Sequence, residues 1–366
     1  MLSWGAERGG LHGRFTKGGD EKRAKRKSKA CYDENRLQRK EDEAMRKRWW
    51  ISVLLISMVF FISSVHPDFA HSARKMVSIA SGWVVGVYFP LAGAISRIAH
   101  EKLPDIKITV ESSGASVANA KLIGTGDADL AILQNDIAFY AYRGTKPMFD
   151  RAISNIRGVA TLYPEHCQIQ ARRAANIQSP KDLKGKRVAV GPLGSGTEQN
   201  AMQILEAYGL TFADLAKVER LTAAESSDYL KDGRIDAAFY TVGVGASALV
   251  DTAMMSDTVI VPIDDAHAEM LIKKYPFFSK AKVPKGSYKG VDQDIPTIAV
   301  LAMIVAKAEL EDDVVYKITK AMFENLKDIE RAHAKGKEVK LETAIVGIPI
   351  PLHPGAERFY KEKGLK

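Results

Sequence analysis

The chain has 366 residues, 46% of them hydrophobic and 27% charged, which is the composition of a globular protein rather than a fibrous one. The formal net charge is +9, but residues 1–48 carry 15 Lys and Arg against 8 Asp and Glu and so account for most of it. The rest of the chain is nearly neutral, which argues against a nucleic-acid-binding surface. Cys167 is the only cysteine after residue 48, which excludes an intramolecular disulfide and a cysteine-based metal site there.

The N-terminal segment is expected to lie outside the folded body. Residues 1–44 are rich in Gly, Lys and Arg and lack hydrophobic periodicity, which predicts a disordered basic extension. In the stretch 45–73, basic residues follow Met45, an uncharged run covers 49–65, and small residues stand at 70–73. This order is that of a secretory signal peptide that starts at Met45, or of an uncleaved membrane anchor. Both interpretations export the body, so we expect a periplasmic protein.

Strands and helices alternate from residue 76 onward. The apolar periodicity predicts strands at 76–80, 106–111 and 130–133, with helices at 88–100 and about 117–124. Alternation of this kind predicts an α/β fold with a parallel sheet, whose ligands bind beyond the carboxyl ends of the strands. Ser113, Gln134 and Asn135 stand at such ends and are therefore candidate ligand-binding residues.

The pattern restarts in the second half of the chain. It predicts strands at 156–162, 168–171, 187–190, 218–221, 235–240, 259–263 and 298–306, and helices at 195–208, 224–230 and 309–334. Gly126 and Gly233 each precede, by three residues, an aspartate (Asp129 or Asp236) beside an apolar strand. This short internal echo favours two similar lobes that face one another.

We predict lobe boundaries from this pattern. One lobe is expected to comprise 76–163 and 262–366, and the other 164–261, with a crossing near Tyr163–Glu165. Glu165 is then a hinge or surface carboxylate, and Asp136 is expected to cap the helix that follows it.

The segment 187–209 is the most informative stretch of the sequence. A short apolar strand leads into a glycine-rich turn, and Ser195 with Glu198 has the spacing of a capping box that starts a helix. The exposed N–H groups of a helix start carry about +0.5 elementary charge, which makes Ser195, Gly196 and Thr197 a candidate anion site. It is not a Walker loop, because no lysine follows the last glycine. An ordinary strand-to-helix turn explains the same pattern equally well.

Taken together, these residues resemble one family over about 290 residues. From Met76 to the C-terminus the chain is similar to the TAXI-type solute-binding proteins of TRAP transporters. The resemblance rests on Tyr88-Phe89-Pro90, Ser113-Gly114-Ala115-Ser116-Val117-Ala118-Asn119, Ala128-Asp129-Leu130-Ala131, Gln134-Asn135-Asp136, Leu162-Tyr163-Pro164-Glu165, Asp182-Leu183-Lys184-Gly185-Lys186-Arg187-Val188, Gly194-Ser195-Gly196-Thr197 and Leu352-His353-Pro354-Gly355-Ala356-Glu357.

The resemblance implies a receptor without catalytic activity. It implies a two-lobed type II periplasmic-binding-protein fold, an amino-acid or dicarboxylate solute, and a TRAP-type membrane permease as partner. Two segments depart from the family pattern: Gly82–Pro90 carries bulky apolar residues where glycines are usual, and Tyr240–Gly245 lacks a proline. Both should border the cleft, so a smaller or more apolar ligand is expected.

The expected site lies between the lobes, which close on the ligand by a hinge motion. Its anionic end should meet the helix starts at Ser195 and Ser116, and neighbouring polar groups should select the rest. The candidate ligand-binding residues are Gly82, Tyr88, Ser113, Ser116, Asn119, Gln134, Asn135, Ser195, Gly196, Thr197, Tyr240 and Gly243. Ser116 and Asn119 could equally serve only to cap their helix. The histidines are scattered without metal-ligand spacing, so neither a metal nor another cofactor is expected.

Two other classes of function stay open on the sequence. Ser195 could be the nucleophile of a hydrolase, but the chain has no G-x-S-x-G elbow and no adjacent histidine as base. Residues 49–65 could anchor a ligand-sensing domain, but no kinase or DNA-binding segment follows. A neighbouring gene for a multi-span permease would favour the transport function over both.

Overall fold

The structure is a computed structural model that describes residues 45–47, 49–50, 74–84, 86–146 and 148–365. The predicted extension 1–44 lies outside the described residues, as does most of the predicted signal or anchor at 45–73. Within the part of the chain that is described, no helix combines the length and apolarity needed to cross a bilayer. The body that follows residue 74 is described below.

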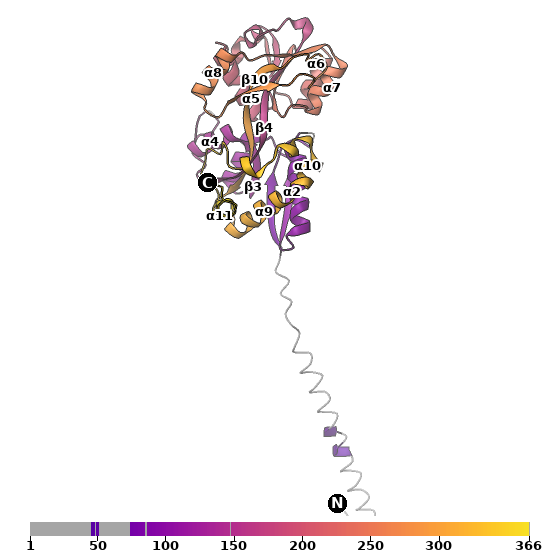
Figure 1. Ribbon diagram of the computed structural model, residues 1–366, viewed down its shortest axis with the longest axis vertical. Coiled ribbons are helices and arrows are strands. Elements are labelled where there is room, and N and C mark those ends of the chain that lie inside the picture. The colour runs from indigo at the N-terminus through magenta and orange to yellow at the C-terminus, as the bar shows by residue number, and fades with distance from the viewer. Residues whose placement is uncertain (1–44, 48, 51–73, 85, 147, 366) are drawn as a thin grey trace, which may run out of the picture. The chain divides into compact units, whose positions relative to one another are not determined.

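One mixed sheet of ten strands runs through the body in the order β2-β1-β3-β10-β4-β7-β5-β6, with β8 paired to β4 and β9 to β10 (Figure 1). The strands are β1 (Lys75–Ala80), β2 (Ile106–Glu111), β3 (Leu130–Gln134), β4 (Ile156–Arg172), β5 (Arg187–Ala189), β6 (Lys217–Glu219), β7 (Ala237–Val242), β8 (Thr258–Val261), β9 (Ser279–Val283) and β10 (Ile295–Lys307). The helices are α2 (Tyr88–Lys102), α3 (Ser116–Thr125), α4 (Asn135–Arg143), α5 (Gly196–Ala207), α6 (Ala223–Lys231), α7 (Ser247–Met255), α8 (Asp265–Lys274), α9 (Asp312–Glu324), α10 (Leu326–Ala332) and α11 (Pro354–Glu362).

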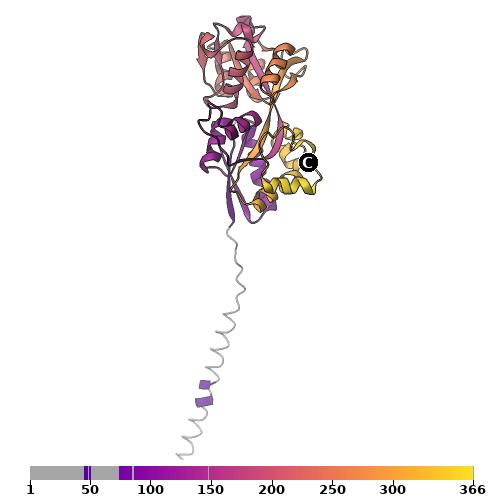
Figure 2. The ribbon, with the colours of Figure 1, turned by 90° about the vertical axis from the view of Figure 1, so that its left-hand side faces the viewer.

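The two ends of the sheet have the same topology. In one half, β1 lies between β2 and β3 in parallel, and β10 adds to β3 in antiparallel fashion. In the other half, β5 lies between β6 and β7 in parallel, and β4 adds to β7 in antiparallel fashion. The predicted parallel α/β organisation with two similar lobes is therefore confirmed. Figure 2 shows the two lobes joined at a narrow waist, and it is the paired strands β4 and β10 that belong to both.

Each lobe has its own hydrophobic core. Buried apolar residues of 77–163 and 302–360 pack together in lobe one, and those of 167–300 pack together in lobe two. The predicted boundary at residue 262 was too early. Ile263, Leu271 and Phe278 belong to the core of lobe two, because the chain returns to lobe one only along β10.

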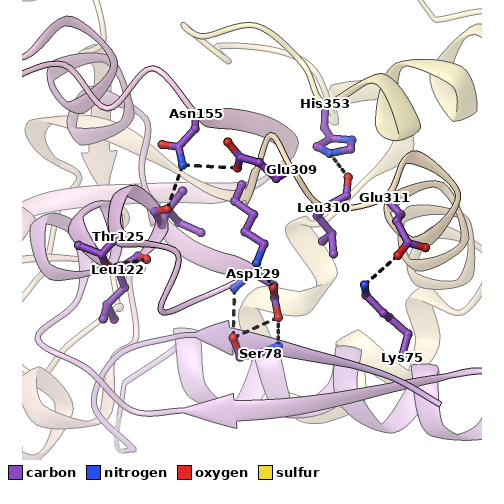
Figure 3. A network of polar contacts seen from close by, with 12 residues as sticks. Lys75, Ser78, Leu122, Thr125, Asp129, Asn155, Glu309, Leu310, Glu311 and His353 are labelled. Atoms are coloured by element: carbon purple, nitrogen blue, oxygen red, sulfur yellow. Dashed lines mark hydrogen bonds and ion pairs between the residues drawn. The ribbon is translucent and has the colours of Figure 1, made fainter. Parts of the chain in front are cut away.

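The short sequence repeat that contains Asp129 and Asp236 corresponds to equivalent polar contacts in the two lobes, where each aspartate links two parallel strands. Asp129 accepts a hydrogen bond from the backbone N–H of Ser78 at 2.8 Å and pairs with Lys307 at 2.6 Å (Figure 3). Asp236 accepts from the backbone N–H of Arg187 at 2.9 Å and pairs with its guanidinium at 2.6 Å. In both lobes this aspartate ties the third strand to the first strand, which fixes the register of the strands that carry the site.

Two predicted elements were wrong. β4 is one strand of 17 residues rather than two strands separated at Tyr163–Glu165. Pro164 is tolerated within it because β4 pairs there only with β10, and pairing with β7 begins at His166. The helix predicted at 309–334 is broken at Asn325, whose φ of −128° separates α9 from α10.

Candidate functional site

A cavity of about 290 Å³ lies between the lobes. Lobe one contributes the loop after β1, the starts of α2 and α3, the end of β3, and His333. The hinge strand β4 contributes Glu165, and lobe two contributes residues from β7 and from the starts of α5, α6 and α7. The residues that line the cavity include Trp83, Tyr88, Ser116, Gln134, Glu165, Ser195, Gly196, Thr197, Ser226, Ser227, Asp228, Tyr240, Asp251 and His333.

Five helices begin at this cavity. Lining residues include Tyr88 of α2, Ser116 of α3, Gly196 of α5, Ala223 of α6 and Ser247 of α7, each the first residue of its helix. The first four N–H groups of a helix have no partner within the helix, and they give its start a partial positive charge. An anion in this cavity would therefore meet several positive helix ends at once.

The α5 start has the predicted Ser195 cap but not the full capping box, because Glu198 accepts from Gly194 and not from the N–H of Ser195. Ser195 is the N-cap, and its Oγ accepts a hydrogen bond from the Glu198 N–H at 3.1 Å. Glu198 in turn accepts from the Gly194 N–H at 2.9 Å. The Ser195 oxygen thus caps a helix, which is a structural role rather than that of an activated nucleophile.

Gly196 is required by a close approach across the cleft. A Cβ atom at this position would collide with the side-chain amide of Gln134, which comes from lobe one. Gln134 is itself positioned by its backbone N–H, which donates to Ser116 Oγ at 3.2 Å. The buried Gln134 Oε1 has no hydrogen-bond partner among the described residues, so the lobe-one wall of the cavity presents an unused acceptor.

Glu165 is a buried carboxyl group at the cavity, with only 3% of its surface exposed. Tyr88 Oη donates to Glu165 Oε2 at 2.6 Å, and Tyr163 Oη donates to Oε1 at 3.4 Å. Burial raises the pKa of Glu165 to about 8, against the lowering effect of the hydrogen bond from Tyr88. The expected hinge or surface carboxylate is thus a hinge residue that faces the cavity and is not on the surface.

The charged side chains that line the cavity are all acidic apart from His333. They are Glu165, Asp228 and Asp251, and neither Lys nor Arg is found among the described lining residues. Lys231 lies nearby but pairs with Asp251 at 2.6 Å and with Asp228 at 3.0 Å. Helix starts, and not cationic side chains, are therefore the groups of this cavity that could attract an anion.

In lobe two the cavity extends along the first two turns of α6 and α7. Ser226 and Ser227 of α6 line it and are buried, and Asp251 marks its limit on α7. The Tyr240 hydroxyl is also buried in this half and has no hydrogen-bond partner within the described part of the chain. A polar group on a solute would satisfy this hydroxyl, whose burial without a partner otherwise costs about 1–3 kcal/mol.

Contacts beside the cavity hold the lobes together. Asn200 Nδ2 of α5 donates to Asp136 Oδ2 of α4 at 2.9 Å, and Gln203 Nε2 donates to Tyr140 Oη at 2.8 Å. Asp136 is fully buried, and this burial raises its pKa to about 6. Asp136 was predicted to cap a helix. The structure gives it a different role, because its Oδ2 accepts a hydrogen bond from Asn200 of the other lobe. The structure is therefore a closed form.

Eight of the twelve predicted site residues line the cavity: Gly82, Tyr88, Ser116, Gln134, Ser195, Gly196, Thr197 and Tyr240. That they bind a ligand stays a prediction. The other four, Ser113, Asn119, Asn135 and Gly243, have structural contacts that account for them.

Two of these residues belong to one hydrogen-bonded cluster beneath the cavity. Asn119 Nδ2 donates to the carbonyl oxygens of Ser81 and Ile132, both at 2.6 Å, and so joins the ends of β1 and β3. Ser113 Oγ donates to Asn119 Oδ1 at 2.5 Å. The carboxyl ends of the strands do bring these side chains together, but their polar groups already form hydrogen bonds with the backbone and with each other.

The other two are occupied by distant segments. Asn135 Nδ2 donates to the Gly347 carbonyl at 3.1 Å, and its Oδ1 accepts from the Leu301 N–H at 3.1 Å. Gly243 lies against the stem of Lys335, which leaves no room for a Cβ atom. Its role is a close approach between the lobes.

The sequence did not predict that Glu165 lines the cavity. It also did not predict that the starts of α6 and α7 do so. A signal for α6 was present, because Thr222 and Glu225 form a capping box just after β6. The start of α7 has no side-chain cap and gave no such signal. Within the described residues, no group of three or more His, Cys, Asp or Glu side chains could hold a metal ion.

The fold and the cavity can now be compared with known proteins. The model of the NMT1-like family matches residues 79–364. The chain belongs to the NMT1-like family. The match spans both lobes and every element that lines the cavity.

Solved structures resemble the chain in fold. PhnD1 from Prochlorococcus marinus, in complex with methylphosphonate, is 13% identical with a TM-score of 0.51; the match covers 79% of this chain and 98% of that one. The alkanesulfonate-binding protein SsuA from Xanthomonas axonopodis pv. citri, bound to MOPS, is 13% identical with a TM-score of 0.42, covering 79% and 84%. The predicted two-lobed type II periplasmic-binding-protein fold is confirmed.

The predicted membership of the TAXI-type proteins of TRAP transporters is wrong. The family whose model matches is the NMT1-like family, over residues 79–364. The short motifs behind the resemblance follow from the topology of the lobes. In this chain the Ser113–Asn119 segment joins strand ends, and Gly194–Thr197 caps a helix.

Proposed function

We propose that this protein is a periplasmic solute-binding protein that captures a small anionic solute between its lobes and delivers it to a membrane transporter. The observation that carries the proposal is the convergence of five helix starts on one closed cavity. Helix starts are ready-made sites for carboxylate, sulfonate and phosphonate groups. The methylphosphonate in the similar PhnD1 structure belongs to the same chemical class.

The cavity size and the hinge fit capture rather than catalysis. A volume of about 290 Å³ suits a small solute that is almost wholly enclosed. Entry requires the α4–α5 contacts to separate, with β4 and β10 as the connecting strands. Lobe closure would then report an occupied site to the transporter. Amino acids, dicarboxylates, sulfonates and phosphonates are the solute classes that this geometry admits.

Binding of simple anions by the purified protein tests the proposal. Melting temperature is measured with glutamate, succinate, pyruvate, ethanesulfonate and methylphosphonate, and each positive result is repeated by calorimetry. A solute at a hundred times its dissociation constant stabilises the folded protein by about 2.7 kcal/mol, a clear shift. If neutral sugars bind and none of the anions does, the proposed anionic class is wrong.

The periplasmic location rests on the signal-like order of residues 45–73. We expect the exported protein to begin between about His71 and Lys75. N-terminal sequencing of the protein from the periplasm tests this expectation, and a sequence that starts before Met45 would contradict it.

A further inference from the structure

The carboxyl group of Glu165 occupies a special place in the cavity. It stands on the hinge strand β4, between Tyr163 in the core of lobe one and Cys167 in the core of lobe two. The side chain lines the cavity and is almost wholly buried. Any solute that fills the cavity therefore shares an enclosed space with this carboxyl group.

The groups that face Glu165 supply no positive charge. Tyr88 from α2 and Tyr163 from β4 are hydroxyl donors, and Gln134 from β3 is a neutral amide. Asp136 from α4 is a further acid whose charge opposes ionisation of Glu165. Glu165 forms no ion pair with any described residue.

The remaining titratable groups nearby do not change this balance. The neighbouring His166 is neutral near pH 7, because burial lowers its pKa to about 4. Lys335, from the turn after α10, forms an ion pair with Glu338 at 2.6 Å. His333 lines the cavity, and burial lowers its pKa from the ordinary value. Asp228 and Asp251 line the cavity in lobe two and add only negative charge.

A solute anion and an ionised Glu165 would oppose each other in this small space. A protonated Glu165 removes the repulsion and adds an O–H donor. We propose that the cavity binds its anion together with one proton, and that Glu165 holds this proton and donates a hydrogen bond to the solute. The proposal rests on the anionic class proposed above and adds a requirement on the charge state. The proton comes from solvent, so the closed complex gains no net charge from the solute.

The direction of the pH dependence follows from the closed form. In this structure, with the lobes in contact, the pKa of Glu165 is raised to about 8. We expect an open, hydrated cleft to bring it back towards the ordinary value of 4.5, because burial is the main cause of the shift. Closure therefore takes up a proton between these two values. Affinity is fully present at the acid end of this window and falls as pH rises through it to about 8.

Calorimetry with ethanesulfonate and pyruvate tests the proposal, because both probes stay singly charged throughout the window. For the wild-type protein we expect the dissociation constant to rise by up to tenfold per pH unit between about pH 5.5 and 8. At pH 7 the binding enthalpy should change with the ionisation enthalpy of the buffer by an amount close to one proton.

Three variants separate this mechanism from its alternatives. Glu165→Gln carries a neutral donor of the same shape, so it should keep the acid-pH affinity within a few-fold. It should lose the proton uptake at pH 7 and the fall in affinity between about pH 7 and 8, where Asp136, whose pKa is raised only to about 6, contributes little. Glu165→Ala should bind more weakly than Glu165→Gln at every pH, because it lacks the donor. Glu269→Gln is the control: Glu269 is an exposed acid on α8 that pairs with Lys280 and does not line the cavity, so this variant should retain the proton uptake of the wild type.

The possible failures differ from one another. If Glu165→Gln abolishes binding, and taurine binds while ethanesulfonate does not, then an ionised Glu165 recognises an ammonium group and the proposal is wrong. If ethanesulfonate or pyruvate binds without pH dependence, the proton requirement is wrong but the anion-binding function stands. If no anion binds the wild type at any pH, the proposed function itself fails.

Discussion

The two lobes share one topology but bring different chemistry to the cavity. Lobe two offers three helix starts, with hydrogen-bonding side chains at Ser195 and Thr222 as caps. Lobe one offers a loop with the bulky Trp83, two helix starts without a side-chain cap (α2 and α3), and the acceptor of Gln134. The buried acid Glu165 lies on the strand between them. The repeated fold thus fixes where the site lies, while the side chains at equivalent turns determine what each half can recognise.

This contrast suggests a division of labour. Lobe two would hold the anionic group of the solute, and lobe one would close over it and exclude water. Exclusion of water strengthens every hydrogen bond made within the cavity. Four changes test this division, and they are taken in order of the size of their expected effects.

Gly196→Val should cause the largest loss, because Gly196 lies at the proposed anion site and against Gln134 of the other lobe. The new side chain would collide with Gln134 and cover the first N–H groups of α5. We expect binding weakened by at least about a hundredfold, a loss on the order of 3 kcal/mol. Calorimetry measures affinity, and solution scattering shows whether the lobes still close.

Gly93→Ala is the control for Gly196→Val. Gly93 lies within α2, and a Cβ atom added there would meet no atom within 4 Å, so alanine should be accepted and should leave affinity unchanged. Equal affinity for Gly196→Val and the wild type would show that the α5 start neither binds the anion nor limits closure.

Thr197→Ala tests the hydroxyl of lobe two with little effect on closure. Thr197 lines the cavity, and its Oγ1 already accepts a hydrogen bond from the Thr241 N–H at 3.3 Å. Its own proton therefore remains free to donate to an anion, a bond worth roughly 1.5–3 kcal/mol. We expect affinity about tenfold weaker and a small change in melting temperature. Thr197→Ser keeps the hydroxyl and should bind like the wild type, and an unaltered dissociation constant in Thr197→Ala would remove Thr197 from the site.

Gly243→Ala should have a smaller effect and acts only through lobe one. Its methyl group would meet the stem of Lys335, a flexible side chain that can move aside. We expect closure to become harder by about 1 kcal/mol, so affinity should fall roughly fivefold. Lys335→Ala in the same protein should restore it, because the collision is gone. No rescue by the double substitution would show that the collision with Lys335 is not what weakens binding.

The sequence predicted the local features of the site well. The Ser195–Glu198 cap and the paired aspartates Asp129 and Asp236 involve residues close in sequence or a repeated pattern, and both were confirmed. The loop with Trp83 was also expected at the cleft, and Trp83 lines the cavity. These features follow from rules about turns and strand ends that need no knowledge of distant segments.

Long-range contacts determined the features that were missed. The side chain of Asn135 is used by Gly347 and Leu301, which are 212 and 166 residues away, so its strand-end position says nothing of its partners. Glu165 is buried only because β4 continues unbroken between two closed lobes. No local pattern reports the burial of a carboxyl group by another lobe, and the same is true of Lys335 over Gly243.

The smallest expected effect is optical and reports on lobe one alone. Trp83 lines the cavity in the loop after β1 and is partly buried against the core of lobe one. It is also the only tryptophan after Trp50. A solute that is held by lobe two and covered by lobe one should exclude water from the Trp83 ring and so shift its emission to shorter wavelength, without any new bond to the ring. Trp83→Phe should abolish the shift and leave the calorimetric affinity within about twofold, since an aromatic ring of similar shape still covers the cavity. If Trp83→Phe loses affinity as strongly as Thr197→Ala, lobe one binds the solute as directly as lobe two, and the division of labour between the lobes is wrong.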